Sequence, residues 1–96
     1  MRNPIPRKLQ QEVWERDEGL CQHCFRQGSL PPHHIVPAGM GRKRVHRIEN
    51  LIILCIKCHT EAHKTRKMRE WCEDWGRDRY GSIIDDLKMA KWSDVL

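Results

Sequence analysis

The sequence contains no long apolar run, no internal repeat and no low-complexity segment. None of its 96 residues lies in a run that approaches the roughly 20 apolar residues needed to span a membrane. Residues 1–6 also lack the apolar stretch of a secretory signal peptide. We therefore expect a cytoplasmic protein without a membrane partner.

Apolar residues are also few for a chain of this length. They make up 39% of the sequence, against 32% charged residues. A domain of about this size is close to the limit at which a hydrophobic core alone gives adequate stability. We therefore expect a single domain over residues 1–96, whose folding would benefit from a bound metal ion.

The charge of the chain is positive but unevenly distributed. The net charge is +5 at pH 7, with a balance of +8 in residues 1–69 and −3 in residues 70–96. A basic body favours a polyanionic partner, of which nucleic acid is the obvious example. A basic soluble domain without such a partner would carry the same charge, so the partner has to be argued from the motifs.

Four of the five cysteines form two Cys-x2-Cys pairs separated by 30 residues, Cys21/Cys24 and Cys55/Cys58. In a reducing compartment such pairs favour zinc over disulfides. The spacing predicts a structural zinc ion bound by four thiolates. Cys72 has no such partner and is expected in the core of a helix.

The histidines form a second group beside the second cysteine pair. His59 and His63 stand four residues apart, on one face of a helix. The neighbouring His33 and His34 would point to opposite faces of a strand, so that one can bind a metal ion while the other acts as a base. Three histidine ligands with open positions are typical of a catalytic metal site. One alternative is a local zinc site of Cys55 and Cys58 with His59 and His63, which leaves the first cysteine pair unexplained.

Periodicity and breaker residues predict the remaining elements. We expect an amphipathic helix over about 6–17, a short strand at 35–36, and a second short strand near the end of a basic loop over 38–47. A helix should start near 55–58 and run to about 75, with a break near Gly76. Gly81 and Ser82 predict a stop followed by the N-cap of a C-terminal helix.

The order of these motifs resembles the HNH endonucleases, in the zinc-knuckle form found in bacteria and phages. Asn50 follows the histidine pair, and His59-x3-His63 follows Asn50 at the end of the second cysteine pair. The resemblance covers about residues 6–64, and residues 65–96 form an extension outside it. It implies an α+β fold with a small ββα-metal (His-Me finger) core, a four-cysteine zinc knuckle and flanking helices.

The resemblance also implies roles for individual residues. His34 would be the general base that activates water, and His33, His59 and His63 would bind the catalytic ion, with His59 as the final residue of the motif. Asn50 is the middle residue of the motif, and here we expect it to fix the loop. The implied reaction is hydrolysis of DNA to 5′-phosphate and 3′-hydroxyl ends.

The implied cofactors are structural Zn²⁺ and a catalytic divalent ion, either Mn²⁺, Ni²⁺, Mg²⁺ or Zn²⁺. Imidazole ligands favour the transition metals over Mg²⁺. The implied partner is DNA, contacted through the basic loop, and a homodimer or a phage packaging or restriction partner is possible. The alternative function is a zinc-ribbon module that binds DNA without cleaving it, or a subunit of a larger phage or restriction machine. The residues expected to contact phosphate are Arg42, Lys43, Arg44 and Arg47.

Overall fold

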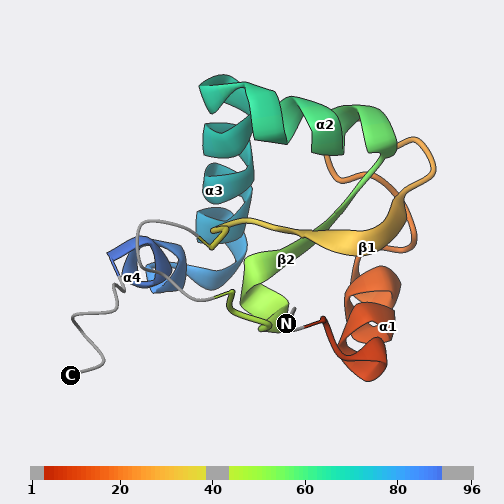
Figure 1. The fold of residues 1–96 in the computed structure, drawn as a ribbon, viewed down its shortest axis with the longest axis horizontal. Helices are drawn as coiled ribbons and strands as arrows, with labels where there is room; N and C mark the ends of the chain where they lie inside the picture. Colours follow the sequence, from red (N-terminus) through yellow and green to blue (C-terminus); the bar gives the residue numbers. More distant parts are fainter. Residues whose placement is uncertain (1–3, 39–43, 90–96) are drawn as a thin grey trace.

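The computed structural model describes residues 4–38 and 44–89 (Figure 1). None of the helices in this part of the chain has the length and apolar character needed to cross a membrane. In these residues the structure contains four α-helices and a two-stranded antiparallel sheet. In chain order the elements are α1 (Arg7–Arg16), β1 (Ser29–His34), the 3₁₀ helix η1 (Ile48–Asn50), β2 (Leu51–Leu54), α2 (Ile56–Lys64), α3 (Arg66–Tyr80) and α4 (Ile83–Met89).

The first strand lies earlier in the chain than predicted. It ends at His34, so the prediction of a strand at Ile35 and Val36 was wrong. Pro31 and Pro32 lie within the strand, in the stretch between Ser29 and His33 where the pairing with β2 is irregular. Their missing N–H donors therefore do not interrupt a regular ladder of hydrogen bonds. Ile35 and Val36 bend away from the sheet and are buried in the core instead.

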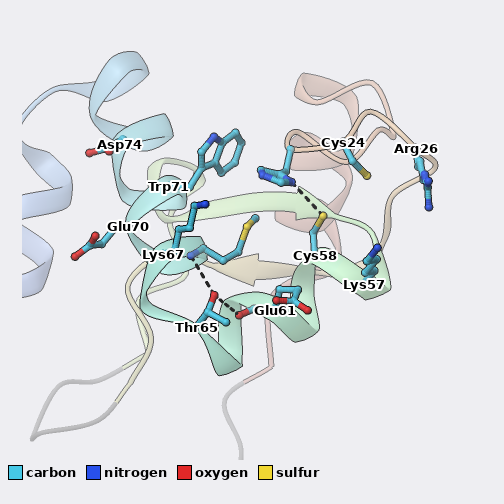
Figure 2. A pocket seen from close by; sticks show the side chains of 12 residues that line it. Cys24, Arg26, Lys57, Cys58, Glu61, Thr65, Lys67, Glu70, Trp71 and Asp74 are labelled. Carbon is cyan, nitrogen blue, oxygen red and sulfur yellow. Dashed lines mark hydrogen bonds between the residues drawn. The ribbon is translucent and has the colours of Figure 1, made fainter.

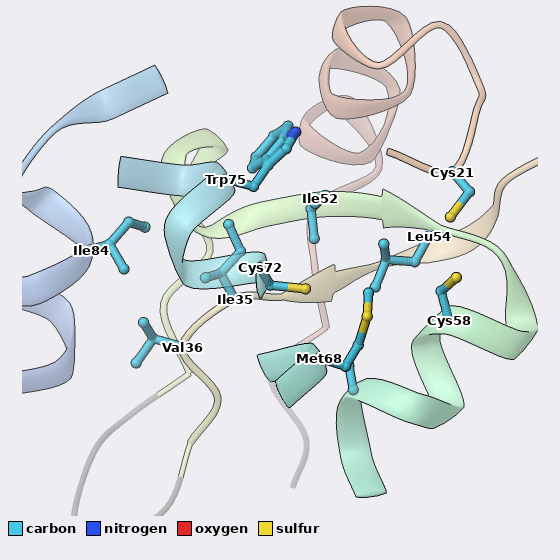
Figure 3. Packing of buried hydrophobic residues seen from close by; sticks show 11 residues of the cluster. Cys21, Ile35, Val36, Ile52, Leu54, Cys58, Met68, Cys72, Trp75 and Ile84 are labelled. Atoms are coloured by element: carbon cyan, nitrogen blue, oxygen red, sulfur yellow. The ribbon is translucent and has the colours of Figure 1, made fainter. Parts of the chain in front are cut away.

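The register of the sheet directs alternate residues to two different cores. His33 lies opposite Ile52, and His34 lies opposite Leu51. Ile52 and Leu54 pack with residues of α2, α3 and α4 in the larger core (Figure 3). On the other face of β2, Leu51 packs with residues of α1 and the N-terminal segment. All four β2 residues are therefore buried, as expected for a strand covered on both faces.

The helix predicted over about 55–75 is in fact two helices that meet at Thr65. Thr65 adopts an extended backbone conformation and caps both elements, ending α2 and starting α3. Its hydroxyl accepts a hydrogen bond from the backbone N–H of Met68, at 3.2 Å. This is the N-cap interaction that a threonine commonly provides, and it turns the chain sharply between the helices.

Gly76 does not break α3, contrary to the prediction. The helix continues to Tyr80 and ends at Gly81, whose φ of +69° favours glycine. A Cβ atom on Gly76 would come within 2.8 Å of a side-chain carbon of Ile84. Gly76 therefore allows α4 to pack closely on α3, and α4 begins at Ile83, as the Gly81-Ser82 pair predicted. Cys72 is buried in this core, as expected.

An ion pair at the end of α1 connects that helix to η1 and β2. The Arg16 guanidinium donates to the Ile48 carbonyl oxygen at 2.6 Å and to the Leu51 carbonyl oxygen at 2.5 Å. It also pairs with the Asp17 carboxylate, whose other contact is a hydrogen bond from the backbone N–H of Ile53 at 2.9 Å. Asp17 is buried, so these bonds replace the water that its charge has lost.

Replacing Asp17 by alanine should therefore destabilise the protein strongly. Asp17→Ala leaves the Arg16 charge and the Ile53 N–H without their partner, and we expect a loss of about 3 kcal/mol in the free energy of unfolding. Urea denaturation followed by circular dichroism measures this loss. Glu12→Ala, at an exposed position of the same helix, is the control and should cost less than about 0.5 kcal/mol. A loss below about 1 kcal/mol for Asp17→Ala would contradict this account of the ion pair.

Candidate active site and metal centres

The four paired cysteines come together as a group. Their sulfur atoms all lie within 4.8 Å of one another, and Cys24 Sγ lies 3.6 Å from Cys55 Sγ. Sulfur atoms bound to one tetrahedral zinc ion lie about 3.8 Å apart. The group therefore fits the structural zinc ion predicted from the sequence.

A tight loop and a helix start place these cysteines. In the loop, the Cys21 N–H donates to the Arg26 carbonyl oxygen and the Phe25 N–H donates to the Cys21 carbonyl oxygen, each at 2.8 Å. Phe25 adopts a positive φ. The backbone N–H of Gln22 donates to the Ile53 carbonyl oxygen, which ties the loop to β2. The second pair stands at the start of α2, where the Cys58 N–H donates to Cys55 Sγ at 3.4 Å.

The environment of Cys21 favours the thiolate form that zinc requires. Burial alone would raise its pKa, but hydrogen bonds from the backbone of Cys24, Cys55 and His23 outweigh burial and lower the pKa to about 7. Cys21 and Cys58 are buried, whereas Cys24 is exposed at the outer side of the group.

His23 lies between the first two cysteines and is exposed, but it has defined contacts. Its Nδ1 atom lies 3.4 Å from Cys58 Sγ, and its ring packs edge-on against Trp71 at 4.7 Å between centroids. Both side chains line a groove of about 570 Å³ (Figure 2). The groove lies between α2, α3 and the cysteine loop, the segment over residues 20–27 that carries Cys21 and Cys24. The lining contains as many acidic as basic side chains, and so carries no net attraction for a polyanion.

The second group consists of His33 from β1 with His59 and His63 from α2. Their candidate ligand atoms lie within 4.8 Å of one another. The Nε2 atoms of His59 and His63 face each other at 3.1 Å, close to the separation of about 3.0–3.4 Å for two nitrogens bound to one ion. His33 is 6% exposed. Among the buried side-chain nitrogen and oxygen atoms of residues 4–38 and 44–89, the Nδ1 atom of His33 is the one that has no hydrogen-bond partner. A bound cation would complete this arrangement.

The electrostatics of the group also suit a metal ion. Burial, followed by repulsion from the other two ligands and His34, lowers the pKa of His33 to about 3. Burial and His63 likewise lower the pKa of His59. Neutral imidazoles at pH 7 are the form that binds metal.

In the part of the chain that the structure describes, the two cysteines and two histidines of the alternative site do not share one group. Cys55 and Cys58 group with the first cysteine pair, and His59 and His63 group with His33. Successive residues on a helix differ by about 100° in direction, so α2 presents its thiols and its imidazoles on different sides.

His34 lies apart from the histidine group and has a partner of its own. Its Nε2 atom is 3.1 Å from Nδ1 of His46, a residue in the segment that leads to η1. Burial, followed by the charges of Arg44 and His46, lowers the pKa of His34 to about 4. The imidazole is therefore neutral at pH 7, as a general base must be.

Asn50 holds the backbone that follows His34 close to the backbone that precedes His46. Its side chain is buried, and its Oδ1 atom accepts from the backbone N–H of Val36 at 2.8 Å. Its Nδ2 atom donates to the carbonyl oxygens of Val36 and Val45, each at 3.1 Å. All the polar atoms of this amide are used by the protein backbone.

The predicted phosphate contacts lie only partly within the described structure. Arg42 and Lys43 fall outside it. Arg44 is half-buried near His34, and Arg47 is exposed and pairs with Glu49 at 3.3 Å. His46 was not predicted as part of the site, because nothing in its sequence spacing distinguishes it from the surrounding basic loop.

Sequence comparison relates the residues of both groups to a known family. A sequence model described as HNH endonuclease matches residues 21–65, which contain both cysteine pairs and all the motif histidines. The chain belongs to the HNH endonuclease family. A similar protein is Anaredoxin from Nostoc sp. (strain PCC 7120), 34% identical over 59 residues that make up 60% of this chain and 75% of that protein. No solved structure gives a significant match to the chain.

The cysteine site generates a direct prediction. Cys24 is exposed, so Cys24→Ala removes a metal ligand with little loss of packing. We expect bound zinc to fall well below one ion per chain and the free energy of unfolding to fall by more than about 3 kcal/mol. Metal analysis by mass spectrometry and thermal unfolding measure the two effects.

The matched control is Cys72→Ala, which removes a thiol from the core of α3. Burial raises the pKa of Cys72 to about 12, so this thiol stays protonated and should not bind zinc. We expect this variant to keep one zinc ion per chain. Equal zinc contents in the two variants would contradict the four-cysteine site.

Proposed function

We propose that this member of the HNH family is a metal-dependent DNA endonuclease. The observation that carries the proposal is the separation of two neighbouring histidines of β1, His33 and His34, into different surroundings. His33 joins His59 and His63 in a group that fits a cation, while His34 is held neutral outside that group. A metal ion beside an uncoordinated neutral imidazole is a combination that can hydrolyse a phosphodiester, because the ion stabilises negative charge and the imidazole accepts a proton from water.

In the proposed reaction, His34 accepts a proton from a water molecule as the water oxygen attacks phosphorus. The bond between phosphorus and the 3′ oxygen breaks, which leaves a 5′-phosphate, and the 3′ oxygen takes a proton to become a hydroxyl. His33, His59 and His63 would hold the divalent ion. When bound, the ion supplies positive charge that stabilises the negative charge developing on the phosphate and the leaving oxygen.

The basic loop would hold the DNA at this site. Arg44 is near His34, and Arg42, Lys43 and Arg47 belong to the same segment of the sequence. Attraction between such a loop and phosphates is independent of base sequence. The cysteine group, with structural zinc, would hold the loop over residues 20–27 against the start of α2.

Cleavage of a supercoiled plasmid tests the general base. We expect the wild type to cut with Mn²⁺ or Ni²⁺ at least as well as with Mg²⁺ and not with EDTA, since imidazole ligands favour the former ions. His34→Ala should lower the rate by about 10²- to 10⁴-fold, because it removes only the proton acceptor.

His23→Ala is the control for the loss of an imidazole, since His23 lies outside the histidine group. Because His23 contacts Cys58 Sγ, the zinc content of this variant has to be measured as well. It should cut at the wild-type rate, provided that zinc content and circular dichroism are equal in all three proteins. If the protein binds DNA but does not cut it with any metal ion, the result would favour a non-catalytic DNA-binding module or a subunit of a larger phage or restriction machine. Equal cutting by wild type and His34→Ala would reject His34 as the base.

The salt dependence of DNA binding tests the basic loop. Replacing Arg42, Lys43, Arg44 and Arg47 by alanine should weaken binding and reduce the slope of log K against log salt by about 0.9 for each phosphate that is no longer neutralised. Fluorescence anisotropy with a labelled duplex at several salt concentrations measures the slope.

The charge-matched control replaces four exposed basic residues of α1 and α3, Arg7, Lys8, Arg66 and Arg69. Its salt slope should stay closer to that of the wild type. The same slope for both quadruple variants would show that net charge, and not the loop, determines binding.

A further inference from the structure

The contact between His34 and His46 has a chemical consequence for the base. The two imidazoles are joined from Nε2 of His34 to Nδ1 of His46, at 3.1 Å, and their rings are tilted by 43° with centroids 5.2 Å apart. The distance is that of a hydrogen bond between ring nitrogens. One of the two nitrogens must therefore carry a proton and the other must accept it.

The backbone around both histidines is fixed by the same side chain. Asn50 bonds to Val36, two residues beyond His34, and to Val45, the residue before His46. The backbone of Asn50 adds a hydrogen bond to its carbonyl oxygen from Ile35 N–H, at 2.8 Å. The buried amide of Asn50, whose polar atoms all make hydrogen bonds, thus holds the two backbone segments that bring the imidazoles together.

The direction of the hydrogen bond decides whether His34 can be a base. If His34 donates its Nε2–H to His46, its Nδ1 atom has no proton and can accept one from water. If His46 donates instead, His34 carries its proton on Nδ1 and has no basic nitrogen to offer. A neutral imidazole has one proton for two nitrogens, so the partner of one nitrogen sets the state of the other.

We propose that His46 is a positioning residue for His34, accepting its Nε2–H at Nδ1 and so holding the other ring nitrogen unprotonated toward the reacting water. This rests on the proposed function, in which His34 is the general base. His46 does not touch substrate or metal in this account. Its effect passes through the orientation and tautomer of His34.

Two substitutions separate positioning from general structure. His46→Ala removes the acceptor, whereas His46→Asn keeps one, because the amide Oδ1 atom is attached to Cγ in the same way as Nδ1 of histidine. With the wild type as reference, we expect His46→Ala to lower kcat for DNA cleavage by about 10- to 100-fold, as for other groups that orient an active-site histidine. KM should stay within about twofold, because DNA binding is not involved. His46→Asn should recover kcat to within about fivefold of the wild type.

The tautomer can be read without any cleavage assay. Long-range ¹H–¹⁵N correlation spectra of the zinc-loaded protein distinguish the two tautomers of His34, whose signals are assigned by their loss in His34→Gln. We expect the wild type and His46→Asn to show His34 protonated at Nε2, and His46→Ala to show a mixture of tautomers.

The outcomes separate this proposal from the nuclease proposal. A wild type that cleaves DNA together with an equally active His46→Ala overturns the role of His46 and leaves the nuclease intact. A wild type that cleaves in no metal overturns the nuclease, and with it the effect on kcat, whatever the spectra show. His34 protonated at Nδ1 in the wild type overturns the proposed hydrogen-bond direction in either case.

Discussion

The antiparallel pairing of β1 with β2 is the constraint on which the site depends. Because neighbouring residues of a strand point to opposite faces, His33 and His34 cannot serve the same ion in regular geometry. The register of β1 against β2 then determines which residues each histidine contacts. His33 lies opposite Ile52, whose side chain faces the core of α2 and α3, and it meets the two histidines of α2. His34 lies opposite Leu51 and meets His46 instead.

The position of α2 completes this division. The helix begins directly after β2, at the second cysteine pair, so its first turns carry both thiols and imidazoles. Because successive residues of a helix differ by about 100° in direction, the thiols and the imidazoles point toward separate groups. Cys58 is buried toward the cysteine loop, while His59 and His63 are more accessible beside His33. A closed four-thiolate group suits a structural ion, and a three-imidazole group at the surface leaves coordination positions open.

Local motifs in the sequence predicted the grouping of cysteines and histidines better than the element boundaries. The paired cysteines, the i, i+4 histidines and the Gly81-Ser82 stop depend on neighbouring residues, and the structure places them as expected. The strand at Ile35 and Val36 was misplaced, because β-propensity does not show that Pro31 and Pro32 can lie in a stretch of irregular strand pairing.

Other features depend on contacts distant in sequence and could not be read from local patterns. Gly76 reads as a helix breaker until Ile84 is seen packed against it. The break at Thr65 appears where the chain must turn for α3 to cover β2. His46 becomes part of the site only through the bonds of Asn50 to two segments of the loop.

X-ray absorption spectroscopy at two metal edges would test the central claim, that one helix start serves two chemically distinct metal centres. The protein would be purified with zinc and then given one equivalent of Ni²⁺. The account predicts a zinc shell of four sulfurs at about 2.3 Å and a separate nickel shell of nitrogen and oxygen at about 2.1 Å with imidazole scattering. A single ion per chain with a mixed shell of sulfur and nitrogen would contradict it.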